Sequence, residues 1–244
     1  ADSLDLMCFS SPFDKASVDF LEGLNAPIYK IASFEITDIP LIKYVAEKNK
    51  PVIISTGIAC YDDIKLAVET CRNAGNDQIT ILKCTSAYPT PMDELNLSMI
   101  PQFRNDFNVD AGLSDHTMGL EAPQIATALG ATVIEKHFIL DRSLGGIDAH
   151  FSLDKDEFKR MVEAVRNVEI AMGTVSYDIT DKQKSSKKMA RSIYVSKHIE
   201  EGDVYSEDNL RSIRPGYGLQ PRYLKDYLGK KADRAWKRGD RFLP

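Results

Sequence analysis

The sequence predicts an α/β protein built on a parallel sheet, and two observations lead to that fold class. Short apolar runs alternate along the chain with stretches whose apolar residues recur at helical spacing. The runs are almost continuously apolar, as expected of parallel strands that are covered on both faces. Strands that alternate with helices form βαβ units and a parallel sheet. About six units are recognisable, two fewer than the eight that close a parallel barrel. Two architectures therefore stay open, an open sheet or a barrel whose first two units are missing.

The predicted elements follow one another without internal repeats or low-complexity tracts. Asp154 is the predicted N-cap of the longest helix, because acidic residues fill the turn that follows it. The predicted strands are residues 6–9, 28–32, 52–55, 79–83, 109–113 and 131–137, and the predicted helices include residues 39–48, 62–74, 119–129 and 155–172.

The chain changes character after Gly173. Residues 174–188 are polar and lack an apolar period, which predicts a linker. Residues 189–244 contain short strand-like runs broken by Gly and Pro, which predicts a small β-rich domain. Residues 1–173 then form the α/β domain.

Composition excludes several classes of protein. The 244 residues are 43% hydrophobic and 27% charged, and the net charge of −5 argues against a nucleic-acid partner. No apolar stretch approaches the ~20 residues of a membrane span, and no leader segment opens the chain. The four cysteines have no C-x-x-C spacing, so we expect reduced thiols and a cytoplasmic protein.

Two histidines, His116 and His137, each follow a predicted strand, and a predicted helix lies between the two strands. Strands joined in this way run parallel and usually side by side, ~4.8 Å apart. The two imidazoles could therefore bind one metal ion, or they could be two structural histidines. His150, in the loop after residue 140, is a possible third ligand or an exposed loop residue. Asp148 in the same loop could orient a metal-bound water or a sugar hydroxyl, or it could be a turn residue.

Lysines interrupt three of the apolar runs, at Lys30, Lys83 and Lys136. A buried ammonium is costly unless it is paired, so we expect either a salt bridge to Glu35 or Glu135, or an anionic ligand. Side-chain alternation places Lys136 on the face opposite His137, which favours Lys30 as the anion ligand. Asp115 is expected to cap the following turn. Hydroxyl side chains collect where five of the strands end, the edge at which α/β enzymes have their sites. They are Ser10, Ser11, Ser33, Ser55, Thr56, Thr85, Ser86 and Ser114.

These motifs resemble the sialic acid synthase family along essentially the whole chain. They are Phe9-Ser10-Ser11-Pro12-Phe13-Asp14, Tyr29-Lys30-Ile31-Ala32-Ser33, Ser55-Thr56-Gly57, Cys84-Thr85-Ser86-Ala87-Tyr88-Pro89-Thr90, Gly112-Leu113-Ser114-Asp115-His116-Thr117, Ile134-Glu135-Lys136-His137-Phe138 and Gly146-Ile147-Asp148. The last segment resembles the small antifreeze-like (SAF) domain that follows the barrel in this family. The resemblance therefore implies an incomplete (β/α)8 TIM barrel followed by a SAF domain.

The resemblance also implies an activity. The family condenses phosphoenolpyruvate with an open-chain amino-sugar aldehyde and water, giving a nonulosonic acid and phosphate, with Mn²⁺ or Mg²⁺ as cofactor. Ser33-Phe34-Glu35 resembles the pseudaminic acid branch, whereas N-acetylneuraminate synthases typically have Ser-Gly-Glu. By resemblance, His116 and His137 bind the metal, and Tyr88, Glu135 and Asp148 lie on the sugar side. The positions that bind phosphoenolpyruvate by resemblance are Lys30, Ser11, Ser33, Ser55, Ser86 and Ser114. Arg214 corresponds to an arginine that reaches the partner's site in a domain-swapped homodimer.

The departure from the family pattern is at the beginning of the chain. The first two barrel strands, with a catalytic glutamate and a second phosphoenolpyruvate-binding lysine, have no counterpart here. We therefore expect residues 1–244 alone to be inactive or badly impaired. Three alternatives stay open: a neuraminate or legionaminate synthase, a non-catalytic sugar- or anion-binding remnant, and a metal-dependent aldolase.

Overall fold

The structure, a computed structural model, describes residues 1–244 apart from the side chain of Asp2. The chain forms two compact units, Ala1–Gly173 and Thr174–Pro244.

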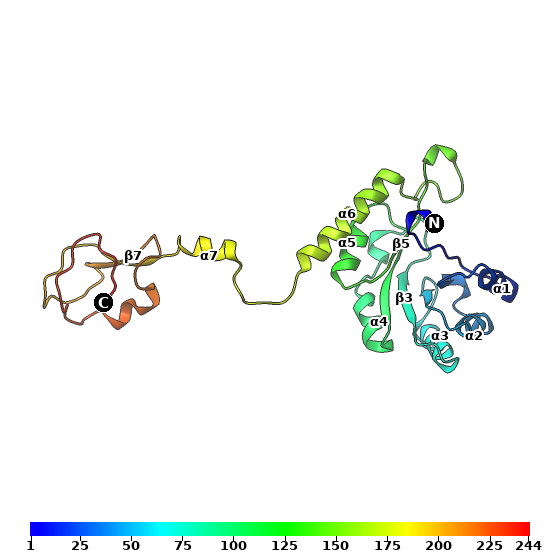
Figure 1. The fold of residues 1–244 in the computed structure, drawn as a ribbon, viewed down its shortest axis with the longest axis horizontal. Coiled ribbons are helices and arrows are strands. Elements are labelled where there is room, and N and C mark those ends of the chain that lie inside the picture. Colours follow the sequence, from blue (N-terminus) through cyan, green and yellow to red (C-terminus); the bar gives the residue numbers. More distant parts are fainter. The chain divides into compact units, whose positions relative to one another are not determined.

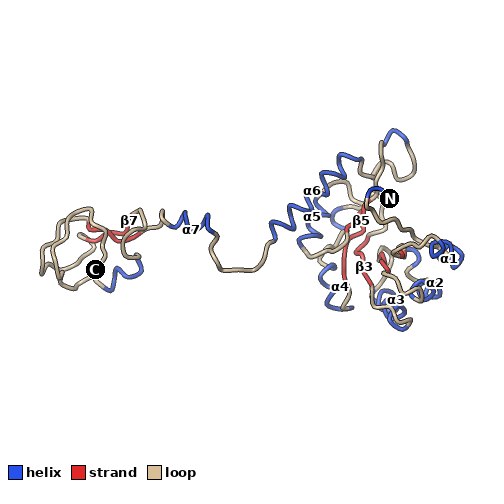
Figure 2. Tube along the Cα trace, viewed as in Figure 1, coloured by secondary structure: helices blue, strands red, loops and turns tan.

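The first unit is built on five parallel strands, drawn red in Figure 2. Neighbouring strands in the sheet are also neighbours in the sequence, without the reversal of order that marks a doubly wound sheet. This is the order of a (β/α) barrel, so the predicted α/β class and incomplete barrel are confirmed. The strands are β1 (Tyr29–Ile31), β2 (Val52–Ser55), β3 (Ile79–Cys84), β4 (Asp110–Asp115) and β5 (Ile134–Lys136).

Helices connect these strands and follow them, as Figure 1 shows. The first turns of two helices are capped by side chains: Asp14 accepts a hydrogen bond from the Ser17 amide, and Asp154 is the N-cap as predicted and also forms a capping box with Glu157. The helices are α1 (Lys15–Gly23), α2 (Ile39–Ala46), α3 (Tyr61–Asn73), α4 (Met99–Phe107), α5 (Glu121–Ala128) and α6 (Lys155–Met172), with 3-10 turns at Asp2–Leu4, Ser33–Glu35, Met92–Glu94 and Arg142–Leu144.

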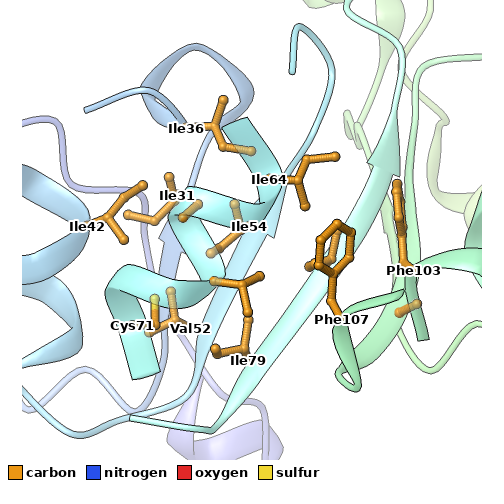
Figure 3. Packing of buried hydrophobic residues seen from close by; sticks show 14 of the residues in the cluster. Ile31, Ile36, Ile42, Val52, Ile54, Ile64, Cys71, Ile79, Phe103 and Phe107 are labelled. Carbon is orange, nitrogen blue, oxygen red and sulfur yellow. The ribbon is translucent and has the colours of Figure 1, made fainter. Parts of the chain in front are cut away.

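The pleat of the strands divides their side chains between two faces. One set packs under α1 to α5 and forms the hydrophobic core, part of which is drawn in Figure 3. That set includes Ile31, Ile54 and Ile81. The alternate positions, such as Lys30 and Ser55, belong to the other face and carry the polar groups.

The sheet is curled as in a barrel. In a flat sheet, four strand spacings of ~4.8 Å would put β1 and β5 roughly 19 Å apart. The side chains of Lys30 on β1 and Glu135 on β5 instead come within 3.7 Å. The polar face is therefore concave, and it brings together side chains that are far apart in the sequence.

One predicted strand is wrong. Residues 6–9 form no strand, and a single bridge between Ser10 and Tyr29 is their link to the sheet. Leu6 and Met7 are exposed and line a pocket of about 880 Å³ with Phe20 and residues 24–27. An apolar run becomes a strand only when a neighbour supplies ladder hydrogen bonds and cover, and one bridge does not supply them.

The second unit has its own small core. Strands β6 (Ser192–Val195) and β7 (Leu210–Ile213) pair antiparallel, and a 3-10 turn spans Pro221–Asp226. Trp236 and Phe242 pack with their rings 5.1 Å apart in the buried cluster. The residues predicted to be a linker contain a short helix, α7 (Asp181–Lys187), which Thr180 caps.

Among the described residues, no helix combines the length and apolar character needed to cross a membrane.

Shortening one buried and one exposed isoleucine tests whether the assigned core residues are the ones that stabilise the fold. Ile54 is 1% exposed, so Ile54→Ala is expected to lower the free energy of unfolding by about 2–5 kcal/mol. Ile170 is 79% exposed on α6, and Ile170→Ala is expected to change it by less than about 0.5 kcal/mol. Urea unfolding of both variants measures the difference. Equal losses would contradict the assigned core.

Candidate functional site

Four polar side chains from four strands meet on the concave face. Lys30 donates a hydrogen bond to the Ser55 hydroxyl, 2.7 Å away, and its Nζ lies 3.7 Å from an oxygen of Glu135. The other oxygen of Glu135 accepts a 2.6 Å hydrogen bond from Ser114. Of the two expectations for Lys30, the salt bridge to Glu135 is therefore present in the structure.

Lys30 is nearly buried, and its environment acts on its charge in two ways. Burial lowers the pKa of its ammonium group, while the charge of Glu135 opposes that shift. Only one carboxylate lies within salt-bridge distance of Lys30 in the described residues, and that carboxylate is itself about 40% exposed. Because the Lys30–Glu135 ion pair is not fully enclosed, the concave face leaves Lys30 open to the approach of another anion.

Beside Lys30, small side chains surround Gly57. The Gly57 amide donates to the Ser33 hydroxyl at 3.0 Å. A Cβ at position 57 would lie 2.1 Å from Ser86 Oγ, 2.7 Å from Ser33 Oγ and 3.0 Å from Cys84 Sγ. Ser86 Oγ is buried and has no hydrogen-bond partner in the described structure, as is also true of one oxygen of Glu35. The Ser86 hydroxyl therefore lies within a wall of small side chains around Gly57.

The two imidazoles predicted to lie together do so. The ring centroids of His116 and His137 are 5.2 Å apart. The Nδ1 of His116 lies 3.1 Å from the carbonyl oxygen of Thr85, which can only accept a hydrogen bond. Nδ1 of His116 therefore carries the proton, and its Nε2 keeps a free lone pair. Nδ1 of His137 lies 3.5 Å from a carboxylate oxygen of Asp148.

Aromatic side chains surround both imidazoles. Tyr88 packs against His116 with ring centroids 4.3 Å apart, and the buried Phe151 lies 4.8 Å from His137. Burial lowers the pKa of both histidines, and for His137 the nearby His116 lowers it further. Burial also raises the pKa of Tyr88. The neutral imidazole is the form that binds a metal ion.

The described residues fit a metal ion in part. Both imidazoles direct Nδ1 toward an oxygen, the usual second contact of a metal-binding histidine. His150 is exposed and packs on Phe151, and no group of three His, Cys, Asp or Glu residues in the described chain could hold a metal ion. Two protein ligands suit a hydrated cation that leaves positions open for water and substrate.

Two predicted residues, Ser11 and Arg214, make none of the contacts described above. Ser11 follows the bridging residue Ser10 at the edge of the sheet and lines a pocket with Asp14. Arg214 belongs to the second unit and is exposed.

Sequence reasoning missed several residues of the site. Gly57 and Cys84 form the wall around the serine hydroxyls, and Phe151 packs on the imidazoles. Asp115 caps its turn as expected, accepting from the Thr117 amide, but it also pairs with Lys136. Strand register was the signal for that pair, since Asp115 and Lys136 are the last partners of β4 and β5.

The fold and this edge define a class of protein: a partial (β/α) barrel with a buried lysine, strand-end hydroxyls and paired imidazoles at its carboxyl edge. The chain belongs to the NeuB family, which matches residues 1–177, and the SAF domain matches residues 190–241. The predicted family and its small second domain are thereby confirmed.

Known relatives agree with that assignment. The chain is 46% identical to pseudaminic acid synthase of Campylobacter jejuni, over 96% of this chain and 68% of that protein. It is 38% identical to N,N'-diacetyllegionaminic acid synthase of the same organism, over 97% of this chain and 72% of that protein. The crystal structure of the spore coat polysaccharide biosynthesis protein SpsE of Bacillus subtilis superposes with a TM-score of 0.69 at 35% identity, covering 99% of this chain and 73% of that one.

The lowered histidine pKa values predict how stability depends on pH. Folded-state pKa values below the ordinary ~6.5 mean that, between those values and ~6.5, the unfolded chain binds more protons. The free energy of unfolding of the metal-free protein should therefore fall as the pH drops below about 6.5. NMR titration of the His116 and His137 rings and urea unfolding across this range measure both effects. A ring that titrates above ~6.5 contradicts the assignment of its burial.

Proposed function

We propose that the chain carries out, within its complete protein, the reaction of a pseudaminic acid synthase. Phosphoenolpyruvate condenses with open-chain 2,4-diacetamido-2,4,6-trideoxy-altrose and water, giving the nonulosonic acid and phosphate. The observation that carries this proposal is the 46% identity to a pseudaminic acid synthase along nearly the whole chain. The arrangement of the concave face supports it residue by residue.

Phosphoenolpyruvate is assigned to the surroundings of Lys30. Lys30 and the hydroxyls of Ser33, Ser55, Ser86 and Ser114 supply one cation and several donors for phosphate and carboxylate oxygens. The orphaned Ser86 hydroxyl and the space kept by Gly57 support this assignment. Ser11 is assigned to the same substrate by family resemblance.

The aldehyde is assigned to the surroundings of the two histidines. His116 and His137 would hold Mn²⁺ or Mg²⁺, which when bound supplies Lewis-acid polarisation of the aldehyde oxygen. Tyr88, Glu135 and Asp148 are assigned to the sugar. Tyr88 and Asp148 each contact one of the two imidazoles, which supports a place beside the reacting aldehyde.

This edge provides part of the groups that the reaction needs. The C3 carbon of phosphoenolpyruvate bonds to the aldehyde carbon, whose oxygen takes up a proton. Water adds to the positively charged C2 and loses a proton, and phosphate leaves as its C–O bond breaks. Glu135 and Asp148 are the carboxylates assigned to hold or move these protons. Lys30 neutralises the phosphate that departs.

The pseudaminic acid precursor is preferred to other amino sugars on two grounds. Identity is 46% to the pseudaminic acid synthase and 38% to the legionaminic acid synthase. Phe34 is 62% exposed in the 3-10 turn directly after β1 and offers apolar surface to a 6-deoxy sugar. Neuraminate and legionaminate precursors remain the alternatives.

We assign the second unit to a homodimer partner, with Arg214 reaching the partner's site and residues 174–188 acting as the linker. Charge supports this assignment. Residues 174–244 have 16 Lys and Arg against 10 Asp and Glu, and residues 1–173 have 15 against 26, so the units carry formal charges of +6 and −11. Opposite charge of this size favours association.

Free thiols at all four cysteines support a cytoplasmic location.

The activity is tested by phosphate release from phosphoenolpyruvate with each candidate sugar, using the protein at the full length that its gene encodes. We expect turnover with the trideoxy-altrose and at least about tenfold less with the neuraminate or legionaminate precursors. Preference for another sugar selects the alternative synthase. Carbon–carbon bond formation without phosphate release selects an aldolase, and binding without turnover selects a binding protein.

Residues 1–244 alone are expected to release phosphate far more slowly than the full-length protein. The reason is that the sheet of five strands leaves the concave face open to water, which weakens electrostatic interactions there. The same phosphate assay checks this, and equal rates would contradict it.

Replacement of Lys30 tests the anion site. Lys30→Met should weaken phosphoenolpyruvate binding roughly 10- to 100-fold, because a charge-assisted contact is lost. Lys83→Met is the matched control, since Lys83 is the register partner of the core residue Leu113 and so belongs to the face of the sheet opposite Lys30. Isothermal titration calorimetry measures both. The assignment fails if the two variants bind alike.

A further inference from the structure

A second ion pair lies behind the two imidazoles, on the opposite face of the sheet. Lys136 Nζ is 2.6 Å from an oxygen of Asp115, and the side chains of the two residues are 1% and 0% exposed. Asp115 directly precedes His116 in the sequence, and Lys136 directly precedes His137. The two charged residues are also register partners at the end of β4 and β5.

The pair closes a ring of hydrogen bonds around the backbone of His116. One oxygen of Asp115 accepts from the Thr117 amide at 2.8 Å, and the other accepts from Lys136. Lys136 also donates to the carbonyl oxygen of Thr117. Asp115 and Thr117, which flank His116, are thus both hydrogen-bonded to Lys136, the residue before His137.

The ends of these strands need such a tie. Strand β5 has three residues, each only partly buried, and it lies at an edge of the described sheet. Beyond His137 the chain is held by the amide of Leu153, in the loop that precedes α6 and not on β4. The Asp115–Lys136 pair joins the ends of β4 and β5 on the face opposite the imidazoles, whereas the Ser114–Glu135 hydrogen bond joins them one position earlier on the concave face.

We propose that Asp115 and Lys136 are positioning residues that hold His116 and His137 at the separation needed to share one metal ion. The inference deepens the proposed function and rests on it, because the metal ion belongs to that proposal. A buried pair of this kind contributes little net stability compared with neutral groups of similar size, so its geometric effect can be separated from stability.

The test uses two variants of the full chain. Lys136→Met leaves the Asp115 carboxylate buried and unpaired, and we expect it to destabilise the fold. The double variant Asp115→Asn/Lys136→Met removes both charges, while the amide oxygen at position 115 can still accept from Thr117. We expect its thermal unfolding midpoint to recover most of the loss seen in the single variant.

The decisive readout needs no metal. With ¹⁵N-labelled histidine, only four side chains contribute signals, and the two rings 5.2 Å apart should show a mutual nuclear Overhauser effect in the wild type. We expect the double variant to lose that effect and to shift both ring signals, while His198 in the second unit keeps its signals as the internal control.

Electron paramagnetic resonance of Mn²⁺ supplies the second readout. We expect the folded double variant to bind Mn²⁺ about 10- to 100-fold more weakly than the wild type, the usual effect of losing a group that orients metal ligands. A double variant that recovers stability together with the ring contact and the Mn²⁺ affinity would overturn the positioning role. If wild-type protein binds no Mn²⁺, the metal proposal fails, and the metal-free ring contact decides the positioning role separately.

Discussion

The site depends on one constraint, the alternation of side chains along parallel strands. Each strand gives its odd positions to one face and its even positions to the other, so Ile31 enters the core because Lys30 does not. Shifting a strand by one residue would exchange the two sets. The register between β4 and β5 is then fixed twice. Leu113 and Ile134 pack into the core on one side, and Ser114 and Glu135 form a hydrogen bond on the other.

The curvature of the sheet brings polar side chains of different strands together on the concave face. Lys30 and Glu135 are 105 positions apart in the sequence and on the first and last strands, yet their charged groups are 3.7 Å apart. Neither residue has a second oppositely charged partner within salt-bridge distance in the described chain. Strand order brings the hydroxyls to one edge, and curvature brings the charges together. Glu135 is thus paired with Lys30 on one side, and its charge acts on His137 on the other.

Periodicity predicted much of this from the sequence. Apolar runs located the five strands, and alternation placed His116, His137 and Glu135 on one face with Lys136 behind them. It failed at residues 6–9, because an apolar run does not reveal whether a neighbouring strand will supply hydrogen bonds. Gly57 and Phe151 escaped prediction for a different reason. Their importance depends on distances to residues on other elements, which spacing along one strand does not contain. The Asp115–Lys136 pair was within reach once strand register was considered.

The salt bridge between Lys30 and Glu135 has a consequence for the binding of anions at this edge. In the ligand-free protein the carboxylate of Glu135 occupies the position of a counter-ion to Lys30. Any anion that reaches the ammonium group competes with it, and a dianion competes strongly because its charge is larger. An anion bound to Lys30 would release one oxygen of Glu135 from the ion pair, while Ser114 still donates to the other oxygen. The occupancy of the Lys30 ammonium group and the environment of the Glu135 carboxylate are therefore coupled through this one salt bridge.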